Sequence, residues 1–155
     1  MPIEIGLEET ARKKVSAALT RYLADTYVLY MRTHGYHWNV EGPRFHSLHV
    51  MFEEQYREMW AALDELAERI RSLGDYAPGN GKELAEAASL AEPTNDRPDA
   101  EGMVRSLLAG HESLTRDARE LIELAAEAGD TGTEDLITQR LAVHEKTAWM
   151  LRASL

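Results

Sequence analysis

Two long helical segments in the first half of the chain limit its fold more than any other feature. Residues 7–39 contain no proline and a single glycine. Side chains recur there at the three- and four-residue spacing of one helix face. They are Val15, Leu19, Leu23, Thr26, Tyr30 and His37. This spacing predicts one helix from about Leu7 to about Trp38.

A second long helix is expected from about Pro43 to Leu73. Proline suits the first turn of a helix, and Gly74 is a natural residue for the helix end. An apolar stripe with helical spacing runs along the whole segment. It consists of Phe45, Leu48, Phe52, Tyr56, Met59, Leu63, Leu66 and Ile70.

The remaining residues predict a crossover and two further helices. Prolines and glycines interrupt residues 75–98, where residues 82–90 have room for one short helix. A third long helix is expected from Asp99 or Ala100 to about Ala128, and a fourth opens at residues 133–135 and ends near Arg152. No segment alternates like a strand. The chain is therefore predicted to be all-α and a single domain, residues 1–155. The expected architecture is a ferritin-like four-helix bundle with one long crossover carrying a short extra helix.

The composition excludes several kinds of site. The chain has 155 residues and no cysteine, so disulfides, thiolate zinc sites, iron–sulfur clusters and cysteine nucleophiles are ruled out. Its 27 acidic and 17 basic residues give a formal charge of -10, which repels nucleic acids and anionic membranes and attracts cations. The first six residues carry no secretory pattern, and no apolar run approaches the ~20 residues of a membrane span. A cytoplasmic protein is expected.

The second helix carries a candidate metal-binding face. His49 and Glu53 are one turn apart, and Asp64 and Glu68 repeat that spacing. At about 100° per residue, all four fall within an arc of about 100° beside the apolar stripe. Nitrogen and oxygen ligands without sulfur suit iron, manganese or zinc better than copper(I).

The same arc also fits a solvated charged face. Arg57 and Arg71 lie within it, as expected for intrahelical ion pairs. Trp60 lies in its middle, however, and a large indole favours a contact surface that contains ligands. From spacing alone, both interpretations stay open.

His37 has two interpretations as well. It belongs to the apolar stripe of the first helix, where a lone histidine is more often a core residue than a ligand. A hairpin turning near Gly42 and Pro43 would instead bring it opposite His49. His34 and His46 lie one turn before His37 and His49 and are expected at the surface, with outer-shell residues or transient ligands as the alternative. His111, His144 and Trp149 are expected to have structural roles, with Trp149 packed near the end of the last helix.

Three blocks of the sequence resemble the Dps family, the DNA-protection-during-starvation proteins or mini-ferritins. The first runs from His37 through Gly42 to Phe45, Leu48, His49 and Glu53. The second is Leu63-Asp64-Glu65-Leu66-Ala67-Glu68-Arg69-Ile70, followed by Leu73-Gly74. The third is His144-Glu145-Lys146-Thr147-Ala148-Trp149-Met150-Leu151. The resemblance covers nearly the whole chain.

The resemblance implies a hollow homo-oligomer, a dodecamer, that oxidises Fe(II) at sites between subunits and stores ferric mineral. Hydrogen peroxide is the expected oxidant, with O2 as the alternative, and two iron ions are expected per site, where other divalent metals can substitute. His37, His49, Asp64 and Glu68 match the family's iron ligands, and Glu53 stands where many members have aspartate. The resemblance also places Trp38 beside the site. It makes Asp130 and Asp135 candidates for an iron-entry pore, although Asp135 also fits a first-turn residue facing a helix dipole.

Helix geometry independently predicts that each site is shared by two chains. His49 and Asp64 are 15 residues apart, which is about 22 Å along one helix. One possibility is two separate sites per chain, each poor in ligands. The other is a second copy of the helix, antiparallel about a two-fold axis, which would pair residues whose numbers add to a constant. That constant is 117 both for His49 with Glu68 and for Glu53 with Asp64. The axis would pass close to Trp60.

Two other functions compete with the ferroxidase. A nucleoid-associated DNA-binding protein is the first, yet residues 1–10 hold three glutamates and no lysine or arginine. The expected helix also ends just before Leu155. Direct DNA binding and membrane binding are therefore not expected, although divalent cations could bridge the protein to DNA. The second is a metal-free helical scaffold whose ligand pattern is accidental.

Overall fold

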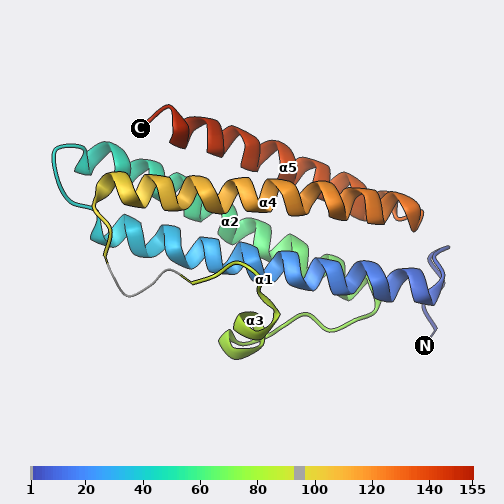
Figure 1. Ribbon diagram of the computed structural model, residues 1–155. Helices are drawn as coiled ribbons and strands as arrows, with labels where there is room; N and C mark the ends of the chain where they lie inside the picture. The colour runs from blue at the N-terminus through green and yellow to red at the C-terminus, as the bar shows by residue number, and fades with distance from the viewer. Residues whose placement is uncertain (1, 93–96) are drawn as a thin grey trace.

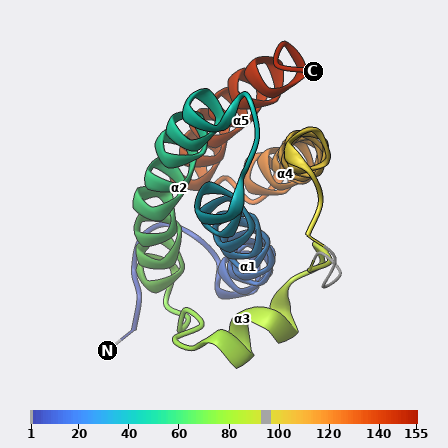
Figure 2. The same cartoon turned by 90° about the vertical axis from the view of Figure 1, so that its left-hand side faces the viewer.

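Four long helices form the bundle in the computed structural model, which describes residues 2–92 and 97–155 (Figure 1). They are α1 (Glu9–Asn39), α2 (Phe45–Leu73), α4 (Ala100–Glu127) and α5 (Thr131–Arg152). The short α3 (Gly81–Ala87) belongs to the crossover and lies outside the bundle against α1 (Figure 2). No strand occurs in the described ranges. The predicted all-α, ferritin-like fold class is confirmed.

Capping groups explain where the helices depart from their predicted ends. α2 begins at Phe45 rather than Pro43 because the chain turns at Gly42, whose φ is 105° and whose carbonyl accepts from the Phe45 amide. α5 begins at Thr131, two residues early, because the Asp130 side chain caps it by accepting from the Thr133 amide.

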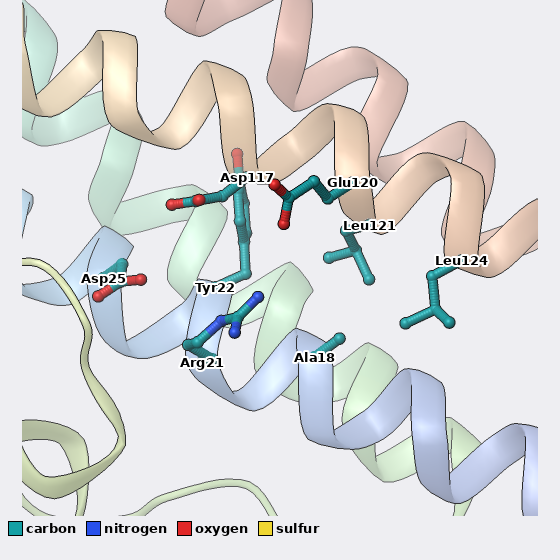
Figure 3. Close-up of a pocket in the computed structure, with 8 residues that line it drawn as sticks. All are labelled: Ala18, Arg21, Tyr22, Asp25, Asp117, Glu120, Leu121 and Leu124. Atoms are coloured by element: carbon teal, nitrogen blue, oxygen red, sulfur yellow. The ribbon is translucent and has the colours of Figure 1, made fainter.

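α3 ends earlier than predicted because Asp25 of α1 forms hydrogen bonds with the residues that follow the helix, Ser89 and Leu90. The Asp25 carboxylate accepts the amides of Ser89 and Leu90, each at 2.6 Å, and the Ser89 hydroxyl at 2.6 Å. Figure 3 shows Asp25 on α1 beside the crossover, while Tyr22 rises from α1 toward α4. Burial and the negative charge of Asp25 raise the pKa of Asp117, which shares a pocket with both residues.

A polar layer crosses the otherwise apolar core. His111 of α4 and His144 of α5 are buried, and their Nδ1 atoms lie 2.8 Å apart in a hydrogen bond. Arg140 is buried, contacts His144 and forms an ion pair with Glu58 of α2, whose side chain is 39% exposed. Burial lowers the pKa of His111 to about 3 and holds that of His144 well below its usual value. Both histidines are buried in the core, as expected for the structural roles that the sequence analysis gives them.

The histidine pair predicts a loss of stability in mild acid. Below a pH of about 6.5 the unfolded chain binds protons at both positions, whereas the folded chain does not. The free energy of unfolding should therefore fall as the pH drops below about 6.5, by about 1.4 kcal/mol per pH unit for each histidine that stays neutral in the folded chain. Urea unfolding at fixed protein concentration measures this slope.

Substitution of His111 and His144 together by leucine should flatten that pH dependence. His46 is exposed, so His46→Leu is the matched control and should leave the slope unchanged. An unaltered slope in the double variant would contradict the assignment of acid sensitivity to this pair.

Candidate metal centre

The hairpin of α1 and α2 brings His37 and His49 into direct contact. Their rings stack with centroids 3.8 Å apart and an interplanar angle of 18°. His37 Nδ1 lies 2.8 Å from the His49 carbonyl oxygen, and His49 Nδ1 lies 2.7 Å from the His37 carbonyl oxygen. Because a carbonyl can only accept, both Nδ1 atoms must carry the proton and donate. In its neutral form, each ring therefore has an unprotonated Nε2 that is available to a metal ion.

The contact between His37 and His49 is compatible with both interpretations of His37. The residue is buried on the apolar stripe of α1, as a core histidine would be, and it also faces His49. Hydrogen bonding of the other ring nitrogen to a carbonyl is the usual way in which a protein fixes the orientation of a metal-binding imidazole. The geometry suits a pair of ligands, and the ligand role itself stays a prediction.

Glu53 lies one turn after His49 and is already engaged. Its carboxylate accepts from Arg57 Nε at 2.8 Å and from Arg57 Nη2 at 2.6 Å. The hydrogen bond with Arg57 is the main reason that the pKa of Glu53 is lowered. Glu53 is thus an ionised carboxylate, and an incoming cation must compete with Arg57 for it.

Asp64 and Glu68 lie far along α2 from the histidines, and both are exposed. Neither carboxylate forms an ion pair with a residue in the described ranges. Asp64 lines a surface pocket of about 600 Å³ together with Trp60, whose side chain is 63% exposed. Within the part of the chain that the structure describes, no three His, Cys, Asp or Glu side chains are placed to hold one ion. The candidate ligands of one chain therefore fall into two separate groups, the histidines with Glu53 and the pair Asp64 and Glu68.

Aromatic side chains surround the histidine pair, among them Tyr30 and Tyr56 of the two predicted apolar stripes. His34 is half-buried, not a free surface histidine as predicted: it stacks on Tyr56 at 3.9 Å and lies 4.2 Å from Trp38, centroid to centroid. Its Nδ1 is hydrogen-bonded to the Tyr30 hydroxyl at 3.1 Å. Burial is the main reason that the pKa of His34 is lowered. His46 is exposed as predicted.

Two further expectations are wrong. Asp130 is 2% exposed, and its carboxylate is occupied by Arg69 Nη2 at 2.5 Å and by Thr133. It caps α5 and cannot line a pore in this conformation, whereas Asp135 is exposed and its pore role stays a prediction. Trp149 does not pack in the bundle, because its indole is 62% exposed.

The helices were compared with the length and hydropathy of a membrane span. Among the described residues, no helix combines the length and the apolar character that a membrane span requires.

Comparison with known proteins places this geometry in a family. A model described as a ferritin-like domain matches residues 16–155. DNA protection during starvation protein 2 of Bacillus anthracis is 38% identical over 143 residues, covering 92% of this chain and 97% of that relative. An uncharacterized low temperature-induced protein of Nostoc sp. is 41% identical over 152 residues, covering 97% and 85%.

The structural comparison agrees with the sequence comparison. The Dps protein of Vibrio cholerae O1, described as a member of a broad superfamily of ferritin-like diiron-carboxylate proteins, superposes with a TM-score of 0.92 at 38% identity. The match covers 99% of this chain and 96% of that chain. DpsC from Streptomyces coelicolor superposes with a TM-score of 0.95 at 28% identity, covering 99% and 90%.

Proposed function

Because this chain belongs to the Dps family of ferritin-like proteins, we propose that it is an iron-storage and iron-detoxification protein. It oxidises Fe(II) with hydrogen peroxide, or with O2, at sites shared by two subunits. The ferric product is stored inside a homo-oligomeric shell, a dodecamer, which keeps iron and peroxide away from DNA.

One observation supports a shared site above all. The chain separates a histidine set, His37 and His49 with Glu53, from a carboxylate set, Asp64 and Glu68. The two-fold axis that pairs His49 with Glu68 also pairs Glu53 with Asp64, since both pairs of residue numbers add to 117. An isologous dimer would therefore complete two identical sites, one at each end of the contact.

The contact itself has suitable chemistry. Trp60 is the large exposed apolar side chain nearest to the proposed axis, and it borders the pocket that also contains Tyr27 and Leu63. Exposed aromatic residues of this kind are typical of the buried centre of a protein interface. In the dimer, Trp60 and its copy would pack together and close the ligand sets off from bulk water.

The ligands fit iron as a substrate. Imidazole nitrogen and carboxylate oxygen are donors that iron accepts, and anionic carboxylates stabilise Fe(III) more than Fe(II). Two Fe(II) ions give up one electron each, and one hydrogen peroxide takes up both electrons and two protons to form two waters. Pairing two ions in one site therefore avoids the one-electron reduction that releases hydroxyl radicals.

Anaerobic addition of Fe(II) and then peroxide tests this proposal. We expect ferric absorbance to grow with two Fe(II) consumed per peroxide, and light scattering should give the mass of a large homo-oligomer. A monomer in solution, or iron oxidation no faster than in buffer alone, would contradict it. Both results together would leave the metal-free scaffold as the better interpretation.

The Arg57–Glu53 pair predicts a variant with improved metal binding. Arg57→Gln should release Glu53 and tighten Fe(II) binding by about twofold, because an exposed intrahelical ion pair contributes only a few tenths of a kcal/mol. Anaerobic Fe(II) titration measures the affinity. Arg105 pairs with Glu101 at the same spacing on α4, so Arg105→Gln is the matched control and should change nothing. Unchanged or weaker binding in Arg57→Gln would argue against Glu53 as a ligand.

A further inference from the structure

Aromatic side chains of α1 and α2 form a continuous network beside the histidine pair, which we call the aromatic network. Its members are Tyr27, Tyr30, His34, Trp38, Tyr56 and Trp60. Tyr30 lies at its centre, with its ring centroid 5.5 Å from that of Trp60 and 6.4 Å from that of Tyr56. Centroid separations of this size are typical of aromatic rings in contact. An electron can therefore pass between members of the network without crossing water.

The aromatic network reaches the candidate metal centre. The ring of Tyr56 lies 5.2 Å, centroid to centroid, from that of His37. Tyr30 in turn contacts Tyr56 and, on its other side, Trp60 near the proposed two-fold axis. An oxidant formed at the metal centre is thus connected to Tyr30 by a single intervening ring.

Tyr30 is the tyrosine whose proton has an acceptor. Removal of an electron makes a phenol hydroxyl a very strong acid, so oxidation of tyrosine needs a base in hydrogen-bond reach. The Tyr30 hydroxyl lies 3.1 Å from His34 Nδ1, within the range of proton transfer. A phenol is a better donor than acceptor, so the hydroxyl donates and Nδ1 accepts. Among the described residues, no other tyrosine hydroxyl is hydrogen-bonded to an imidazole or a carboxylate.

Charge and burial also distinguish Tyr30 from its neighbour Tyr56. The guanidinium carbon of Arg57 lies 5.7 Å from the centre of the Tyr56 ring, and a cation at a ring face opposes the removal of an electron from that ring. In the ranges that the structure describes, no cation lies over Tyr30. Tyr30 is only 9% exposed, so a radical formed there is shielded from molecules in solution. Within the network, an oxidising equivalent therefore comes to rest on Tyr30.

We propose that Tyr30 is a one-electron donor to the metal centre, with His34 as its proton acceptor; this inference rests on the proposed function. When a single Fe(II) meets hydrogen peroxide, one electron from iron produces a hydroxide ion and a hydroxyl radical. Tyr30 supplies the second electron through the network, and the hydroxyl radical becomes a second hydroxide ion. The phenol proton moves to His34 Nδ1, which leaves Tyr30 as a neutral phenoxyl radical.

A second Fe(II) ion restores Tyr30. It gives one electron to the phenoxyl radical, and His34 returns the proton. Over both steps, two Fe(II) are oxidised and one peroxide is reduced to two hydroxide ions, which is the same balance as in the paired reaction. Tyr30 therefore lets a site that holds one iron ion reduce peroxide fully, without releasing a hydroxyl radical.

Flash photolysis of the assembled, iron-free protein tests the electron transfer by itself. Trp38→Phe and Trp149→Phe leave Trp60 as the only indole of the three in the chain. An ultraviolet flash at the red edge of tryptophan absorption, with an electron scavenger present, converts Trp60 to its radical. We expect the absorbance of this radical to decay while that of a phenoxyl radical grows at the same rate. The rate should not depend on protein concentration, since both groups belong to one chain.

Two variants in this background separate the electron donor from the proton acceptor. Tyr30→Phe removes the donor, so most of the phenoxyl absorbance should be lost. His34→Phe keeps an aromatic ring in the network and removes the base. It should slow the transfer by about 100-fold, the lower end of what a positioned base contributes. Tyr76 is 85% exposed and lies outside the network, so Tyr76→Phe is the matched control and should change neither yield nor rate.

A second experiment tests whether iron chemistry uses Tyr30. Fewer than one Fe(II) per site is added to the otherwise unmodified protein, followed by peroxide. Freeze-quenched samples should give the electron paramagnetic resonance signal of a tyrosyl radical. Tyr30→Phe should lose this signal and yield more spin-trapped hydroxyl radical, whereas Tyr76→Phe should behave like the unmodified protein.

Three results would overturn the inference. The first is formation of the phenoxyl radical at the same rate and yield in Tyr30→Phe. The second is transfer at the normal rate in His34→Phe, which would remove His34 as the proton acceptor. The third is equal release of hydroxyl radical by Tyr30→Phe and the unmodified protein. Because the flash experiment contains no iron, its outcome does not depend on the proposed ferroxidase activity, and the two proposals can fail separately.

Discussion

Asp64→Ala should slow the oxidation of Fe(II) by peroxide by about 100-fold or more, because even residues that only support a metal ligand typically contribute 10–100-fold. The substitution removes a charged ligand from the carboxylate half of the proposed site. Asp64 is exposed and forms no ion pair with a described residue, so the bundle should fold normally without it. Stopped-flow absorbance of the ferric product measures the effect.

Glu65→Ala provides the matched control for this variant. Glu65 is the adjacent exposed carboxylate on α2, but it points about 100° away from Asp64 around the helix. It should keep close to normal activity, and both variants should keep the oligomer mass of the unmodified protein. An Asp64→Ala oligomer that oxidises iron at the normal rate would remove Asp64 from the site.

Mixing two inactive chains should restore activity if the site is shared. One chain carries His37→Ala and His49→Ala, and the other carries Asp64→Ala and Glu68→Ala. Each mixed dimer would contain one site with all four residues and one site with none. Random pairing makes half of the dimers mixed, so the reassembled protein should recover about a quarter of the normal number of sites. Fe(II) oxidation by peroxide after dissociation and reassembly gives the recovered activity.

The two parent proteins, each taken through the same reassembly alone, are the controls for this experiment. They should stay inactive, since neither chain can complete a site with its own kind. Native mass spectrometry should first establish that mixed oligomers form. Mixed oligomers as inactive as either parent would show that the histidines and carboxylates act in separate sites within one chain.

Local sequence signals were sufficient for the helices because a helix buries one face and its ends need specific residues. The stripe from Phe45 to Ile70 predicted α2, and Leu73 and Gly74 mark its end as expected. The errors in the helices were confined to their ends. Local groups at Gly42 and Asp130 set the starts of α2 and α5, and a distant group intervened after α3. Asp25 captured the backbone after α3, and no pattern within residues 82–90 could have revealed a partner on α1.

The candidate site was only partly visible in the sequence. Spacing on α2 grouped His49 with Glu53 and Asp64 with Glu68, and the hairpin argument placed His37 opposite His49. Spacing could not show that the two imidazoles exchange hydrogen bonds with each other's carbonyl oxygens, or that His34 stacks on Tyr56. Those contacts depend on the rotation and register of α1 against α2, which both helices fix together.

The sequence by itself determined the helices, their apolar faces, the absence of sulfur ligands and the numerical pairing that predicts a shared site. Each of these depends on residue identity and on a regular rise and rotation per residue. Only the tertiary structure decided which polar side chains are buried and what they meet. Asp130, a pore candidate in the sequence, is a buried cap of α5 in the structure, and the side chain of Trp149 is exposed. The packing of α1 against α2 also brought Trp60 into contact with Tyr30, because contact and burial are properties of packed helices and not of any one segment.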